Sequence, residues 1–174
     1  MKTLIYCFIL TFVTQFNWEL FTSMEGNFSI LSPAKLEEKK QLIPSELGKI
    51  EYYTYSYHFE DPKEKNFAYV VSYSDYPKGM IPLDSINIRE EFLASSMEAA
   101  AENLKGEIVY AQPEIQQDIN GLRGRIEYSN GAAVMRTKMF FHQDRFYSIQ
   151  VFSTSANSLN KDSEKFLGSF RFLE

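Results

Sequence analysis

Residues 124–138 of the chain read GRIEYSNGAAVMRTK, two segments of alternating apolar and polar residues joined by an Asn-Gly dipeptide. Asn-Gly is favoured in the two-residue turn of a β-hairpin. With the turn placed there, Ile126 lies opposite Met135 and Arg125 lies opposite Arg136. Because neighbouring residues of a strand point to opposite faces, this register gathers apolar groups on one face and cations on the other. The stretch therefore predicts an antiparallel hairpin with one buried face.

The same alternation continues in both directions, and residues 107–153 are predicted to form a four-stranded antiparallel meander. A second Asn-Gly dipeptide, at residues 120–121, predicts the turn between the first two strands. This turn would bring Ile115 opposite Ile126, on the apolar face. The two Asn-Gly turns thus predict the same buried face independently.

The last turn of the meander is expected to differ from the other two. A two-residue loop at residues 143–144 would oppose Lys138 to Ile149 and mix cationic with apolar side chains. A three-residue loop, Gln143–Arg145, keeps the two faces apart. Since a slip of one residue flips every side chain of a strand, the odd-length loop is the prediction.

Residues 50–60 and 66–75 form two more alternating segments, joined by the turn formers of DPKEKN. They predict a long hairpin with an aromatic row at every second position. We interpret this row as a core face, because such alternation is typical of a sheet that is buried on one side. The alternative is a ligand platform. In the first arm the row consists of Tyr53, Tyr55, Tyr57 and Phe59.

Asp84 or Ser85 is predicted to cap an amphipathic helix that ends near Leu104, before Gly106. The helix is expected to lie on the sheet through one apolar stripe. A short strand is predicted at residues 28–33 and a largely irregular loop at 34–48. A short helix capped at Asn157 or Ser158 and ending at Gly168 precedes a last strand, SFRFL. The stripe of the long helix consists of Ile88, Phe92, Met97, Ala100 and Leu104.

The composition fits one globular domain that is rich in β-structure. The chain has 174 residues, 44% hydrophobic and 16% aromatic, and aromatic side chains favour strands. Its formal net charge is −5, the wrong sign for nonspecific binding to nucleic acid or anionic lipid. Nucleic acid is therefore not an expected partner.

The N-terminus is typical of a secretory signal peptide. Lys2 precedes an apolar run from Thr3 to Phe16, which is too short to span a bilayer. We assign residues 1–22 to the leader, with cleavage between about 17 and 25, and predict an exported protein without a membrane span. An uncleaved N-terminal membrane anchor is the alternative. The single cysteine, Cys7, lies in this segment, so the exported chain would lack thiol chemistry, thiolate metal ligands and disulfides.

Five stretches within residues 26–174 carry a family resemblance: FSILSP (28–33), NFAYVVSYSDYP (66–77), LKGEIVYAQPEIQQDINGLRGRIEY (104–128), DRFYSIQVFS (144–153) and FLGSFRFL (166–173). In these stretches the chain resembles the PsbP-like proteins. The resemblance implies a single α+β domain, an antiparallel sheet with helices packed on it in an α/β/α sandwich. It also implies a role as a binding or assembly factor, since these proteins share no active site.

A basic group on the polar face of the meander is the candidate binding site. The predicted registers place Arg125 opposite Arg136 and Arg123 opposite Lys138, and like charges in such pairs repel unless anions intervene. Asp118, expected opposite Arg123, would supply one acid, and Glu127 is nearby. These four cations therefore predict a site for a small anion or an acidic protein partner. The alternative is a solvated or helix-covered face balanced by local carboxylates.

Neither histidine lies in a recognisable catalytic or metal-binding motif. His58 and His142 have no second histidine at metal-ligand spacing, and no G-x-S-x-G motif is present. We therefore expect no metal, no cofactor and no catalytic residues. The leading prediction is an exported, non-enzymatic binding or assembly protein. The alternatives are a small hydrolase with its site in a cleft between helix and sheet, and a purely structural periplasmic protein.

Overall fold

The computed structural model describes residues 17–45, 48–61, 63–81 and 85–173. Its largest element is a seven-stranded antiparallel sheet. The strand order across this sheet is β3 (Glu37–Ser45), β4 (Gly48–His58), β5 (Asn66–Asp75), β9 (Arg145–Thr154), β8 (Ala133–His142), β7 (Ile119–Tyr128) and β6 (Glu107–Gln116).

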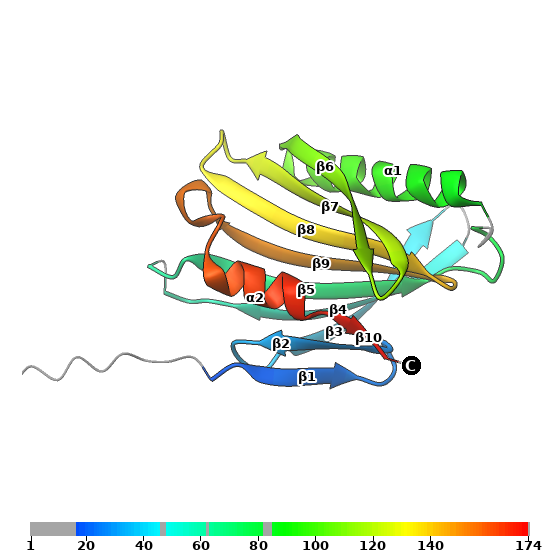
Figure 1. Ribbon diagram of the computed structural model, residues 1–174, viewed down its shortest axis with the longest axis horizontal. Helices are drawn as coiled ribbons and strands as arrows, with labels where there is room; N and C mark the ends of the chain where they lie inside the picture. The colour runs from blue at the N-terminus through cyan, green and yellow to red at the C-terminus, as the bar shows by residue number, and fades with distance from the viewer. Residues whose placement is uncertain (1–16, 46–47, 62, 82–84, 174) are drawn as a thin grey trace, which may run out of the picture.

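Different layers cover the two faces of the large sheet (Figure 1). Helix α1 (Ile86–Leu104) packs on β6, β7 and β8 from one side. On the other side lies a three-stranded antiparallel sheet, with α2 (Lys161–Ser169) packed on β2 and β9. The fold is therefore α+β and rich in strand, and a short sheet replaces most of one helical layer of the expected sandwich. The short sheet has the order β1 (Glu19–Ser23), β2 (Phe28–Ser32) and β10 (Arg171–Phe172).

The aromatic row of the long hairpin forms the core between the two sheets. Tyr53 and Tyr55 of β4 are at most 4% exposed, and Tyr73 of β5 is fully buried. Phe28 of β2 packs against Tyr55 and Tyr73, with ring centroids 5.6 and 6.5 Å apart. The interpretation of this row as a core face is confirmed for these residues. Tyr57 and Phe59 at the end of the row are only partly buried.

The central register of the meander is the predicted one. Ile126 pairs with Met135, and Arg125 pairs with Arg136. Ile126 and Met135 are buried under α1. Between β7 and β8, the amide of Gly131 donates to the carbonyl of Tyr128, closing the turn that contains the Asn-Gly dipeptide.

The predicted turn between β6 and β7 is wrong by three residues. Gln116 pairs with Ile119, so the turn consists of Gln117 and Asp118, whose φ angles are 48° and 61°. Positive φ at both positions is what a type I′ hairpin turn requires. Gly121 lies inside β7 instead, where it pairs with Phe140.

The loop between β8 and β9 has two residues, Gln143 and Asp144, and not the predicted three. His142 pairs with Arg145, and Lys138 therefore lies opposite Ile149. The predicted separation of cations from apolar groups therefore fails on the face of the sheet where α2 lies. On that face, cationic side chains of β7 and β8 lie beside the aromatic core. Ion pairs with carboxylates, described below, make this arrangement tolerable.

Residues 37–45 form strand β3, where the sequence had indicated a loop. β3 pairs along its length with β4 and lies at the edge of the large sheet. Its EEKK segment has no apolar alternation, and charged residues are common on edge strands. The strand conformation of residues 37–45 is therefore set by pairing with β4, and not by a local pattern in their own sequence.

The predicted helices are confirmed with shifted details. The Ser85 side chain accepts a hydrogen bond from the amide of Ile88 and caps α1, while Asn160 caps α2 in place of Asn157 or Ser158. Ile88 is 43% exposed, so it does not belong to the buried stripe of α1. The fully buried members of that stripe are Leu93, Met97 and Ala101. No helix in the described ranges is both long and apolar enough to cross a membrane.

Strand β1 overlaps the end of the assigned leader, residues 1–22, of which residues 1–16 lie outside the described part of the chain. The strand pairs with β2, and Trp18 just before it packs edge-on against Tyr69 at 5.9 Å. Lys165 of α2 lies 4.5 Å from the centre of the Trp18 ring. A cut before Trp18 leaves these contacts intact, whereas a cut after Thr22 removes them.

We therefore expect a chain that begins at Asn17 to be more stable than one that begins at Met24. The shorter chain loses the packing of Trp18 and Phe21, for which we expect a loss of about 2–4 kcal/mol in the free energy of unfolding. Urea unfolding followed by circular dichroism measures the difference. Equal stability of the two chains would show that β1 contributes nothing to the fold.

Candidate functional site: a cleft beside helix α1

The four predicted cations lie together on the α2 side of the sheet, in the predicted pairs. Three of them are in close ion pairs: Arg125 with Glu127 at 2.6 Å, Arg136 with Glu164 at 2.7 Å and Lys138 with Glu114 at 2.6 Å. Their side chains are only 12–16% exposed. The environment therefore matches the alternative interpretation, a covered face balanced by carboxylates.

Arg123 is the exposed member of the group, at 52%. The predicted partner Asp118 is in the β6–β7 turn, and Gln112 lies opposite Arg123 instead. The Arg123 guanidinium donates to the Gln112 side-chain carbonyl at 3.0 Å and lies 3.8 Å from Glu114. The register error in β6 explains why the predicted acid was the wrong one.

The basic group divides between two shallow hollows. Arg123, Arg136 and Lys138 line one of about 100 Å³ beside α2. Arg125 lines another of about 400 Å³ with Lys65, next to the short 3-10 helix Ser155–Asn157. The structure thus keeps the four cations near one another without directing them into one pocket.

The two histidines do not lie together in a site. The His142 ring packs on Phe172 at 5.2 Å, and its burial lowers the pKa of the imidazole. His58 is at the end of β4 and pairs with Ala68. Within the described ranges no group of three His, Cys, Asp or Glu side chains has the arrangement of a metal site.

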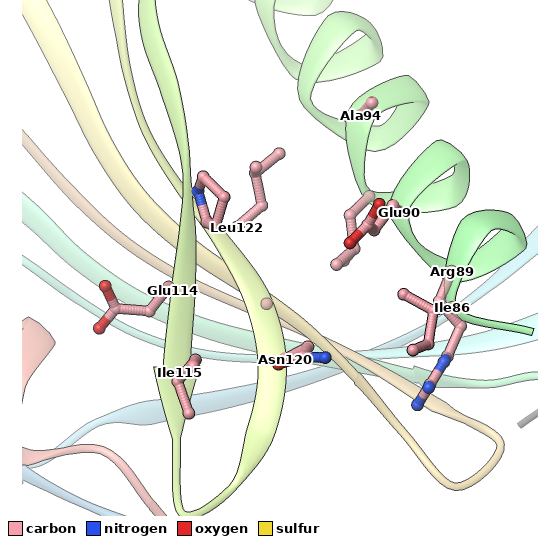
Figure 2. Close-up of a pocket in the computed structure, with 11 residues that line it drawn as sticks. Ile86, Arg89, Glu90, Ala94, Glu114, Ile115, Asn120 and Leu122 are labelled. Atoms are coloured by element: carbon pink, nitrogen blue, oxygen red, sulfur yellow. The ribbon is translucent and has the colours of Figure 1, made fainter. Parts of the chain in front are cut away.

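A cleft of about 370 Å³ opens between the first half of α1 and the β6–β7 hairpin (Figure 2). Its walls are mainly aliphatic. Ile86, Leu93 and Ala94 come from α1, while β6 and β7 contribute the remainder of the apolar surface: Pro113, Ile115, Gly121 and Leu122. Leu93 joins the buried cluster under the helix, so the cleft continues the hydrophobic core to the surface.

Two large aliphatic side chains remain exposed at this cleft. Ile86 in the first turn of α1 is 52% exposed, and Ile115 near the end of β6 is 69% exposed. They come from opposite walls, one from the helix and one from the hairpin (Figure 2). Exposed apolar groups gathered at a concave site, with polar groups at its margin, are typical of an interaction site.

Polar groups mark the margin of the cleft. Arg89 and Glu90 project from α1, and the Asn120 side chain points from β7 towards the helix (Figure 2). Glu114 points away from the cleft, towards Lys138 on the other face of the sheet (Figure 2). The cleft therefore combines an apolar interior with a mixed polar rim, which is the composition of a protein-binding pocket.

The sequence interpretation missed this cleft because it misplaced one turn. With the turn at residues 120–121, Ile115 would have been opposite Ile126, in the buried middle of the sheet. The observed register places Ile115 opposite Asn120, close to the hairpin tip. The tendency of Asp118 to adopt positive φ was the only local signal that could have indicated the correct turn.

No protein family and no curated protein matches this sequence. Among solved structures, the chain is similar to cyanobacterial PsbP (CyanoP) from Synechocystis sp. PCC 6803. The TM-score is 0.52 at 13% identity, covering 97% of this chain and 98% of that one. A protein of unknown function from Pseudomonas aeruginosa, described as a putative regulator, aligns with a TM-score of 0.41 at 10% identity over 80% and 85% of the two chains. The first similarity shows that this chain has a PsbP-like fold.

Proposed function

We propose that this chain is an exported, non-enzymatic binding protein that holds an apolar side chain of a protein partner in the cleft between α1 and the β6–β7 hairpin. The supporting observation is the pair of exposed isoleucines, Ile86 and Ile115, on its opposite walls. Burying a side chain of leucine size between them contributes about 1.5–3 kcal/mol to binding. A partner that fills the cleft would remove both isoleucines from water.

The partner segment is extended and basic. Strand β6 is at the edge of the large sheet, where an extended chain can pair with its outer backbone groups. The exposed surface of α1 is acidic, and none of its glutamates forms an ion pair with another described residue. Lysine or arginine next to the apolar anchor would complement this charge. The glutamates are Glu90, Glu91, Glu98 and Glu102.

Three labelled ten-residue peptides test the proposal by fluorescence anisotropy. They share alternating leucines and carry lysine, serine or glutamate between them. We expect the lysine peptide to bind most tightly and the glutamate peptide most weakly. Ala94→Trp, which fills the cleft from the exposed surface of α1, is expected to weaken binding about tenfold or more. Ile115→Ser should act in the same direction from the other wall.

Ala99→Trp is the matched control, because Ala99 is also an exposed alanine of α1 but lies outside this cleft. We expect it to leave peptide binding unchanged. Unaltered binding in both Ala94→Trp and Ile115→Ser would overturn the proposal. Equal affinity for the lysine and glutamate peptides would overturn the assignment of a basic partner.

Anion binding by the basic group is the second candidate function. Four cations, Arg123, Arg125, Arg136 and Lys138, contact three carboxylates, Glu114, Glu127 and Glu164, which leaves one positive charge in excess. The buried Nε of Arg136 has no hydrogen-bond partner among the described residues. A small anion would balance the excess positive charge and accept a hydrogen bond from the Nε–H of Arg136. This role stays a prediction, as do the hydrolase and structural alternatives.

A further inference from the structure

A second cleft flanks the other side of α1, and its chemistry differs from that of the first. It has a volume of about 560 Å³ and lies between the second half of α1 and the strands β3, β4, β5, β8 and β9. This size is within the range of pockets that hold small molecules. We call it the neutral cleft, because none of its described lining residues is charged.

The floor and walls of the neutral cleft are largely apolar. Met135 and Met139 of β8, together with Phe146 and Phe152 of β9, form the sheet side. Ala99, Ala100 and Leu104 of α1 form the helix side. Methionine side chains adapt to ligands of different shape. This lining fits an aliphatic or aromatic ligand body.

Ser148 and Gln150 of β9 line the cleft and belong to a polar row. The other members of the row, Ser72 and Thr137, pair with them on the neighbouring strands but do not line the cleft. The Ser148 hydroxyl accepts a hydrogen bond from the Gln150 side-chain amide at 3.0 Å and lies 3.4 Å from the Thr137 hydroxyl. Ser72 of β5 pairs with Ser148, so the two side chains share this face. The row therefore runs from β5 through β9 to β8.

The polar row has unused hydrogen-bonding capacity. Ser72 lies opposite the lining residue Ser148 without lining the cleft itself; it is 1% exposed, and its hydroxyl has no hydrogen-bond partner among the described residues. A buried hydroxyl without a hydrogen bond costs free energy, so such groups are normally satisfied by protein, water or ligand. Further neutral polar groups lie along the cleft: Tyr52, Ser74, Tyr76, Ser96 and Asn103. Burial raises the pKa of the Tyr76 phenol above its ordinary value.

We propose that the neutral cleft binds a small uncharged molecule that has an apolar body and a hydroxyl or amide head group. The body would lie on the methionine and phenylalanine side chains, and the head group would hydrogen-bond to the row around Ser148. A carboxylate or ammonium head group is disfavoured, because the lining offers no opposite charge and an unpaired buried charge is costly. This second site is separate from the proposed partner site, the cleft between α1 and the β6–β7 hairpin, which we call the peptide cleft.

Octan-1-ol, octanoate and octylamine share one chain length and differ in the charge of the head group, so they test the inference. Binding of each to the purified protein is measured by saturation-transfer NMR and by calorimetry at neutral pH. We expect octan-1-ol to bind and both ions to bind at least about tenfold more weakly. Octanoate binding as tightly as the alcohol would overturn the inference.

Two tryptophan substitutions on the same helix separate this site from the peptide cleft. Ala99→Trp fills the neutral cleft and is expected to abolish octan-1-ol binding, while Ala94→Trp, in the other cleft, leaves it unchanged. Both alanines are exposed, so we expect each variant to fold, which circular dichroism and thermal unfolding check. Alcohol binding that survives Ala99→Trp, or that is lost only in Ala94→Trp, would overturn the assignment. Failure of the peptide experiment would leave this result unaffected.

Ser148→Ala tests the head-group contact within the same cleft. Removing this hydroxyl is expected to weaken octan-1-ol binding by about five- to tenfold, the effect of one lost hydrogen bond. The hydrophobic probe octane should bind the variant and the original protein alike. An equal loss for octane and octan-1-ol would show that Ser148 shapes the cleft without binding the head group.

Discussion

Replacing Phe28 by alanine is expected to lower the free energy of unfolding by about 3–5 kcal/mol, the usual cost of truncating a buried phenylalanine. Phe28 is fully buried between the two sheets. Its ring packs on Tyr55 of the large sheet at 5.6 Å and stacks on Phe170 before β10 at 5.6 Å. The substitution therefore leaves a cavity at the contact between the layers. Urea unfolding followed by the fluorescence of Trp18, the single tryptophan, measures the change.

Phe67→Ala is the matched control for this substitution. Phe67 is also in a strand that packs on the core, but it is 36% exposed. We expect this control to cost about 1 kcal/mol or less, since little apolar surface is uncovered. Equal losses for the two variants would mean that the contact between the sheets contributes no more than an ordinary surface position.

Gly121→Ala is expected to destabilise the protein by about 1–3 kcal/mol, although it adds only one methyl group. A Cβ at this position would overlap the ring of Phe140 and approach the Met139 carbonyl oxygen to 2.5 Å. Phe140 is fully buried, and the carbonyl belongs to the backbone of a central strand. Neither can move without disturbing the β7–β8 pairing. Thermal unfolding and urea unfolding both report this loss.

Gly168→Ala, in contrast, is expected to stabilise the protein. Gly168 is in α2, and a Cβ there would meet no atom within 4 Å. Alanine has a higher helix propensity than glycine, so stability should rise by up to about 1 kcal/mol. A stable Gly121→Ala variant would contradict the register of β7 against β8. Because Gly121 also lines the peptide cleft, it would contradict the geometry of that site too.

Local signals predicted a large part of the secondary structure. The Asn-Gly turn between β7 and β8, the alternation in β4 and β5, and the Ser85 cap of α1 all hold. Each depends on residues that are close together in the chain. Turn chemistry, the two-residue period of a strand and helix capping are local interactions, which one sequence is sufficient to reveal.

The errors arose where two local signals competed or where none was present. The dipeptide at residues 120–121 resembled a turn, but close packing against Phe140 requires a glycine in the strand there. Residues 37–45 lack the alternating pattern of a strand, and they form a strand only because β4 lies beside them. The separation of faces predicted for β8 and β9 ignored the possibility that carboxylates from β6 and α2 pair with Lys138 and Arg136.

The sequence by itself determined an antiparallel, aromatic-rich sheet with one long helix, because periodicity and turn chemistry act over a few residues. Only the tertiary structure decided which strands α1 covers, that the four cations are largely neutralised, and that Ile115 lies at the mouth of a cleft. Both candidate clefts border α1 and are lined by residues far apart in the chain. Their existence depends on strand register and on where the helix lies, which long-range packing sets and no single segment encodes.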